Sequence, residues 1–236
     1  MTERLLLALT VGLPAGALSA VVLLAWARRL RCRLLKQWGV AGRLTSNLPA
    51  CSVAVKRRLD RLLVGGLCLS PVLVLLNWGL GWFALAAAIY CAGLQVLARI
   101  DAQTHLLPDA LTLPLLWAGL LFQWLGGWIA LHDAVAGAAT GYAVLWLIWA
   151  AFRGCTGRDG IGFGDFKLAA ATGAWLGIEA LPWALLVASC LACLVTSVVA
   201  CSGILSSRRP CSEPLAFGPY LAFGGIVMLF CTQHSL

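Results

Sequence analysis

Apolar residues run through this chain in long stretches that short polar segments separate. A helix needs about 20 mainly apolar residues to cross roughly 30 Å of hydrocarbon at about 1.5 Å per residue. We predict eight such helices, the sixth of them short: residues 5–27, 62–80, 82–100, 110–131, 134–152, 166–177, 181–205 and 215–232. The stretches lack the every-second-residue alternation of membrane barrel strands. The pattern therefore predicts an all-α, polytopic integral membrane bundle.

Composition agrees with this prediction. Apolar residues make up 61% of the 236 residues and charged residues 11%, and the mean hydropathy is +0.92. A soluble domain has about 45–50% apolar and about 25% charged residues. One globule of this size could not bury so much apolar surface, so the composition excludes an ordinary soluble enzyme, a disordered protein and a fibre.

The net charge of +8 is explained by membrane topology and does not indicate nucleic-acid binding. The eight predicted helices place 16 of the 17 basic residues on one side, and only Arg4 on the other. Basic loops stay in the cytoplasm, so the crowded side is predicted to be cytoplasmic and both termini extracytoplasmic. The first apolar stretch is expected to be an anchor without signal cleavage, because its basic cluster follows it.

The ten cysteines do not predict a metal site. Cys190 and Cys193 have the spacing of a metal or redox pair, but they fall within an apolar stretch, where cysteine packs as a small hydrophobe. The first cytoplasmic loop has only Cys32 and Cys51, nineteen residues apart, where two close Cys-x-x-Cys pairs would have indicated zinc. We therefore expect no zinc.

Ionisable residues at membrane depth indicate a functional site. Two segments at the predicted cytoplasmic ends of helices carry such residues: the first is 99–109 and the second is 159–167. In the second segment Gly160, Gly162 and Gly164 precede Asp165. Glycines at alternate positions permit positive φ and close backbone approach, and they can open a short helix with Asp165 at its N-terminus. A flexible loop with a helix cap is the simpler alternative.

In the first segment Asp101 ends a strongly apolar helix, Pro108 interrupts it, and Asp109 is expected to cap the next helix. Peptide hydrolysis by water needs one carboxylate as base and one carboxyl group as acid. Eight helical residues would place Asp101 and Asp109 about 12 Å apart. Asp101 with Asp165 is therefore the better pair. No serine–histidine or cysteine–histidine pair competes with it, and no nucleotide-binding motif is present.

Three segments, in order from about residue 85 to the C-terminus, resemble the signatures of one family. Asp101 with residues 107–120, the Gly-x-Gly-Asp segment with residues 160–177, and residues 217–225 are similar to those of type IV prepilin peptidases, which are intramembrane aspartyl proteases.

This resemblance implies a bacterial inner-membrane endopeptidase with its active site facing the cytoplasm. Its substrate would be a type IV prepilin or a type II secretion pseudopilin, cut between a short basic leader and an apolar helix. Asp101 and Asp165 would be the catalytic pair, and Gly162 and Gly164 would shape the turn. Lys167 would orient Asp165 or contact substrate, or would simply mark the cytoplasmic side. Prepilin and membrane lipid are the expected partners, and the peptidase itself would need no cofactor.

The N-terminal region departs from the family pattern. Many members have a larger first loop with two Cys-x-x-Cys pairs and also methylate the new N-terminus with S-adenosylmethionine. We expect residues 1–61 to form an anchor helix and a basic loop, and residues 62–236 to form the peptidase domain. A bifunctional peptidase and methyltransferase, a carboxylate-dependent transporter and a non-catalytic assembly protein are the alternatives.

Overall fold

A computed structural model of the chain describes residues 70, 72–79, 81–157, 162–201 and 216–232, together with Ala25 and Arg29. Every regular element within these ranges is a helix, and the described residues include no strand. Three of the helices are long and apolar enough to cross a membrane. The predicted all-helical membrane protein is thus confirmed for the described part. The predicted helix 5–27 and the first basic loop lie almost entirely outside it.

The chain divides into two compact units, Met1–Thr104 and His105–Leu236, and each is treated by itself. In the first unit, helix α4 (Trp82–Thr104) begins where the hydrophobic pattern predicts and continues one turn beyond the predicted end at residue 100. Asp101 therefore lies inside the last turn of α4. Residues 72–78 are also helical, and Gly79 ends them with a φ of 67°.

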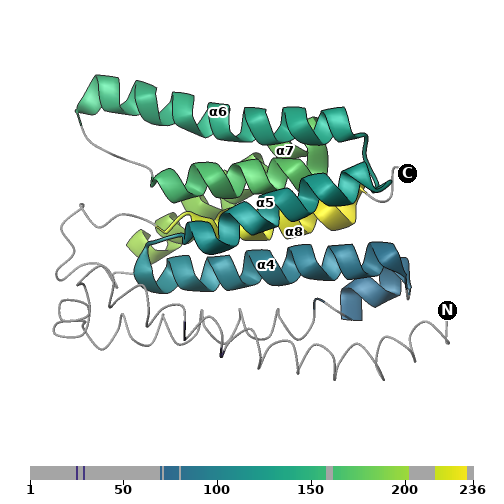
Figure 1. Cartoon of the computed structure of the whole chain (residues 1–236). Coiled ribbons are helices and arrows are strands. Elements are labelled where there is room, and N and C mark those ends of the chain that lie inside the picture. Colours follow the sequence, from purple (N-terminus) through teal and green to yellow (C-terminus); the bar gives the residue numbers. More distant parts are fainter. Residues whose placement is uncertain are drawn as a thin grey trace. The chain divides into compact units, whose positions relative to one another are not determined.

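The second unit contains α5 (Asp109–Trp124), α6 (Leu131–Thr156), α7 (Phe163–Cys201) and α8 (Gly218–Thr232). Helix α7 contacts each of the other three, and α6 runs along it (Figure 1). The predicted helix 110–131 is too long at its C-terminal end, because Gly126 has a φ of 88° and the chain turns there. Residues 125–130 form an apolar connection, which a hydrophobic pattern cannot distinguish from a helix.

Small residues bring α6 and the first half of α7 into backbone contact. A Cβ added at Gly137 would lie 2.5 Å from the carbonyl oxygen of Gly173, and one at Gly141 would lie 2.6 Å from that of Ala169. Gly137 and Gly141 are four residues apart on α6, and Ala169 and Gly173 are four residues apart on α7. Both contacts therefore fall on one face of each helix. Such spacing lets helices in lipid approach until their backbones touch, where dispersion forces are strongest. We call these four residues the glycine seam.

Helix α7 is broken at Gly177, whose φ of 80° and ψ of 177° are not helical. The predicted break between residues 177 and 181 is thereby confirmed. The second half of α7 turns back from this point (Figure 1). The carbonyl oxygen of Trp175 accepts hydrogen bonds from Gln123 Nε2 at 3.1 Å and from Trp128 Nε1 at 2.8 Å. These side chains satisfy a backbone group that the break would leave unpaired at membrane depth.

The aromatic rings beside the break pack together. Trp175 is buried, stacks on Phe122 at a centroid distance of 5.7 Å, and donates from Nε1 to the carbonyl oxygen of Leu115 at 2.8 Å. Beyond the break, Gly224 of α8 lies directly against the backbone of Ala184. Rings at the break and a close helix contact beyond it therefore fix both halves of α7.

Candidate active site

Asp165 is the third residue of α7, so its carboxylate lies in the first helical turn, as predicted. Its backbone N–H donates to the carbonyl oxygen of Gly162 at 3.1 Å, which closes this turn. The helix dipole favours a negative charge here, while the residue is only 7% exposed. A buried carboxylate at the start of an apolar helix is the kind of group that carries chemistry in membrane proteins.

The two glycines before Asp165 have different surroundings. Neither Gly162 nor Gly164 has a positive φ, so unusual backbone geometry does not explain them. A Cβ at Gly164 would lie 2.7 Å from the Cβ of Leu107, whereas one at Gly162 would meet only Asp165 Oδ2 at 3.8 Å. Gly164 is thus required for space. It lets the segment before α5 lie directly on the first turn of α7.

Lys167 does not pair with Asp165. Its Nζ donates to both carboxylate oxygens of Asp109, at 2.6 and 2.7 Å. The prediction that Asp109 caps α5 is wrong, because the N-cap is Pro108, no side chain caps the helix, and Asp109 is its first residue. The carboxylate instead reaches across to α7, and the ion pair joins the first turns of the two helices.

Aromatic residues of α6 hold another face of this turn. Phe163 packs on Trp149 with a centroid distance of 5.2 Å, and Phe166 makes an edge contact with Tyr142 at 5.8 Å. The Arg153 guanidinium lies over the Trp149 ring, 5.1 Å from its centroid. Trp149 could not be predicted at the site, because nothing in an apolar stretch marks which large residues touch it. Leu107 lies within the family-like segment 107–120, but nothing in the sequence assigned it a role.

Asp101 belongs to the first unit. It lies in the last turn of α4 and is 5% exposed. The chain leaves that helix through His105, whose φ of 53° is left-handed and ends α4. Of the predicted site residues, the structure brings Gly164, Asp165 and Lys167 together in the second unit, whereas Asp101 lies at the end of the first.

Metal ligands are not gathered in the described part of the chain. No group of three or more histidine, cysteine, aspartate or glutamate side chains occurs among these residues. Cys190 and Cys193 are free and exposed on α7. Cys32 and Cys51 lie outside the described residues, so the expectation of no zinc stays a prediction.

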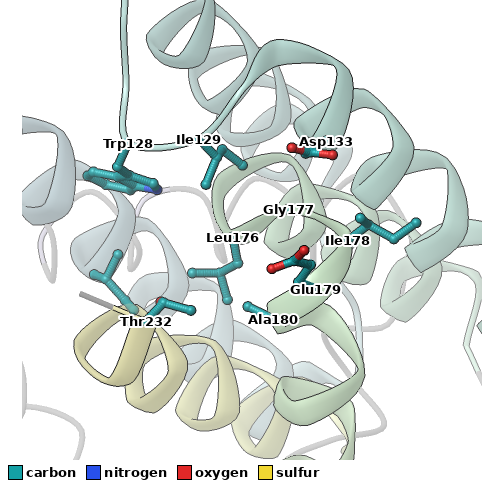
Figure 2. A pocket seen from close by; sticks show the side chains of 10 residues that line it. Trp128, Ile129, Asp133, Leu176, Gly177, Ile178, Glu179, Ala180 and Thr232 are labelled. Atoms are coloured by element: carbon teal, nitrogen blue, oxygen red, sulfur yellow. The ribbon is translucent and has the colours of Figure 1, made fainter. Parts of the chain in front are cut away.

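A cavity of about 230 Å³ lies at the other end of the first half of α7. Figure 2 shows Asp133 from α6 and Glu179 from α7 among its lining residues, beside the break at Gly177. Twelve helical residues, roughly 18 Å, separate that break from Asp165. The cavity is therefore not part of the carboxylate site.

Comparisons with known proteins identify the family of the chain. Residues 88–198, which include both Asp101 and Asp165, match the type IV leader peptidase family. A prepilin leader peptidase/N-methyltransferase of Aeromonas hydrophila is 43% identical over 217 residues, which cover 92% of this chain and 68% of the relative. The protein of that name in Dickeya chrysanthemi is 44% identical over 93% of this chain and 78% of its own.

A third relative with that name, from Burkholderia pseudomallei (strain 1026b), is 50% identical over 147 residues, which cover 62% of this chain and 46% of the relative. No solved structure matches the chain. The identity and coverage, above all with the Aeromonas and Dickeya proteins, show that the chain belongs to the type IV leader peptidase family and is a protease.

Proposed function

We propose that this protease is an aspartyl endopeptidase that removes the short basic leader from type IV prepilins or type II secretion pseudopilins at the cytoplasmic face of the bacterial inner membrane. The observation that carries the proposal is the buried carboxylate of Asp165 in the first turn of α7, in a chain whose relatives are named prepilin leader peptidases. Buried carboxylates at helix ends are otherwise rare in apolar bundles.

Asp101 is the proposed partner of Asp165. It is also buried, and it also lies at the end of an apolar helix. Leu107, which packs on Gly164, is only the sixth residue after it in the chain. One carboxylate removes a proton from water as the oxygen attacks the scissile carbonyl carbon. The other, protonated, gives its proton to the leaving amide nitrogen as the carbon–nitrogen bond breaks.

The orientation of the chain follows from its charges. We infer eight membrane helices with both termini outside, because 16 of the 17 basic residues then face the cytoplasm together with Asp165. A phosphatase reporter fused after Gly126 should be active, and one fused after Gly157 should be inactive. The reverse pattern would contradict the proposed orientation.

The experiment that tests the mechanism is cleavage of a co-expressed pilin-type precursor. Asp101→Asn and Asp165→Asn should each abolish leader removal while the protein stays in the membrane. Asp133→Asn is the matched control, because Asp133 lies beside the cavity at the far end of the first half of α7, and it should cleave as the parent does. Full processing by either of the first two variants would exclude the two-aspartate mechanism.

N-methylation is a second candidate activity, favoured by the names of the relatives, which are prepilin leader peptidase/N-methyltransferases. The first cytoplasmic loop has only Cys32 and Cys51 in place of the two Cys-x-x-Cys pairs of many family members, so we derive no methyl-transfer step. Mass spectrometry of the cleaved product, made in cells that lack other family members, should show a free amino terminus. A methylated terminus would establish the second activity.

A further inference from the structure

The first turn of α7 is held on two of its faces. At about 100° per residue, Phe163 and Phe166 share one face, and this face packs on the α6 aromatic residues. Gly164 and Lys167 share a second face. It meets Leu107, just before α5, and Asp109, the first residue of α5. Contacts three residues apart on a helix fall on one side, so each face has two fixed points.

Asp165 occupies the remaining face. On the same helical geometry its side chain leaves the axis about 130° from the centre of either held face. Lys167 follows Asp165 by two residues and therefore projects in a different direction, which is why it reaches Asp109 instead. The two held faces together set the rotation of α7 about its own axis. That rotation decides where the Asp165 carboxylate points.

The ion pair is well placed to position the helix and poorly placed to stabilise the fold. The side chains of Lys167 and Asp109 are 32% and 56% exposed, and exposed pairs contribute little to stability. Its geometry is nevertheless specific, since one ammonium group contacts both carboxylate oxygens. A misplacement of about 1 Å at a catalytic group can lower a rate by about 100-fold.

We propose that Asp109 and Lys167 are positioning residues, which fix the rotation of α7 so that Asp165 faces the scissile peptide. The inference rests on the proposed function of Asp165. It assigns no contact with substrate to either residue. Loss of either partner should therefore slow the chemical step without weakening the binding of prepilin.

The test is a double-mutant cycle on the purified full chain, with kcat and KM measured for cleavage of a prepilin. Lys167→Met and Asp109→Asn should each lower kcat by about tenfold, with KM within about twofold of the parent, because only positioning is lost. The double variant should be no slower than the single variants, because each single variant already removes the same ion pair. Lys167→Arg should keep most of the activity, since arginine can also bind a carboxylate through two hydrogen bonds.

Charge reversal tests whether the ion pair itself, and not either side chain alone, carries the effect on kcat. Asp109→Lys combined with Lys167→Asp should restore kcat above that of either single reversal. A KM raised by Lys167→Met but unchanged by Asp109→Asn would instead assign Lys167 to substrate binding and overturn the proposal. Losses that multiply in the double variant would overturn it as well.

The parent and Asp165→Asn separate this proposal from the proposed function. If the parent does not cleave prepilin, the function is wrong. If the parent cleaves and the cycle shows no coupling between the two residues, the function stands and the positioning role is wrong. Asp133→Asn is the control, because it removes one carboxylate far from this ion pair. Its kcat and KM should equal those of the parent.

Discussion

The two ends of the first half of α7 are held in different ways. Around Gly173 and Gly177 the helix is fixed by backbone contact with Gly137 and by two side-chain hydrogen bonds to one carbonyl oxygen. Around Asp165 the contacts are made by side chains of its neighbours: the ion pair with Asp109, the aromatic residues of α6, and Leu107 on Gly164. Backbone contacts leave no room for substitution, whereas side-chain contacts can be exchanged. We therefore expect substitutions near Gly173 to lower mainly stability, and substitutions near Asp165 to lower mainly activity.

The largest effect is expected in the glycine seam. Gly173→Val should lower the free energy of unfolding by about 3 kcal/mol or more, because its side chain would enter the Gly137 backbone, which cannot move aside. Thermal unfolding of the purified protein measures this. Gly154→Val on α6 is the control, because a Cβ there would meet nothing within 4 Å. Equal stability of the two variants would show that the seam is not tightly packed.

A smaller effect on stability and a clear effect on activity are expected at the start of α7. Gly164→Ala should lower the cleavage rate by about 10- to 100-fold, because its methyl group would push against Leu107 and displace Asp165. Leu107→Ala in the same chain should restore much of the rate by making room. The rates of both single variants and of the double variant measure this coupling. A double variant no faster than Gly164→Ala would contradict the packing of Leu107 on Gly164.

The smallest effect is expected at the broken turn. Trp128→Phe keeps a ring but removes the donor to the Trp175 carbonyl oxygen, and it should cost about 1 kcal/mol of stability because Gln123 still bonds that oxygen. Thermal unfolding and prepilin cleavage should be measured together. Unchanged kcat alongside lower stability is the expected result. A large loss of kcat would show that the two ends of the helix are coupled.

Some of this arrangement could be predicted from the sequence. The start of α4 at Trp82, the break at Gly177 and the place of Asp165 in a first helical turn all follow from apolar runs and from glycine. The end of α5 was missed because residues 125–130 are mainly apolar, although the pair Gly126-Gly127 is a turn signal that could have marked it. The partner of Lys167 could not be predicted. The sequence does not show which carboxylate Lys167 contacts, and only the packing of α5 on α7 brings Asp109 to it.

The glycine seam has a consequence for local opening of the fold. Amide hydrogens near Gly137 and Gly173 lie where two backbones touch, so they can exchange with solvent only when the helices separate. The first turn of α7 can instead come apart by breaking one ion pair and a few ring contacts. Amide exchange at the start of α7 should therefore be faster than in the middle of the bundle, where α6 and α7 must separate first.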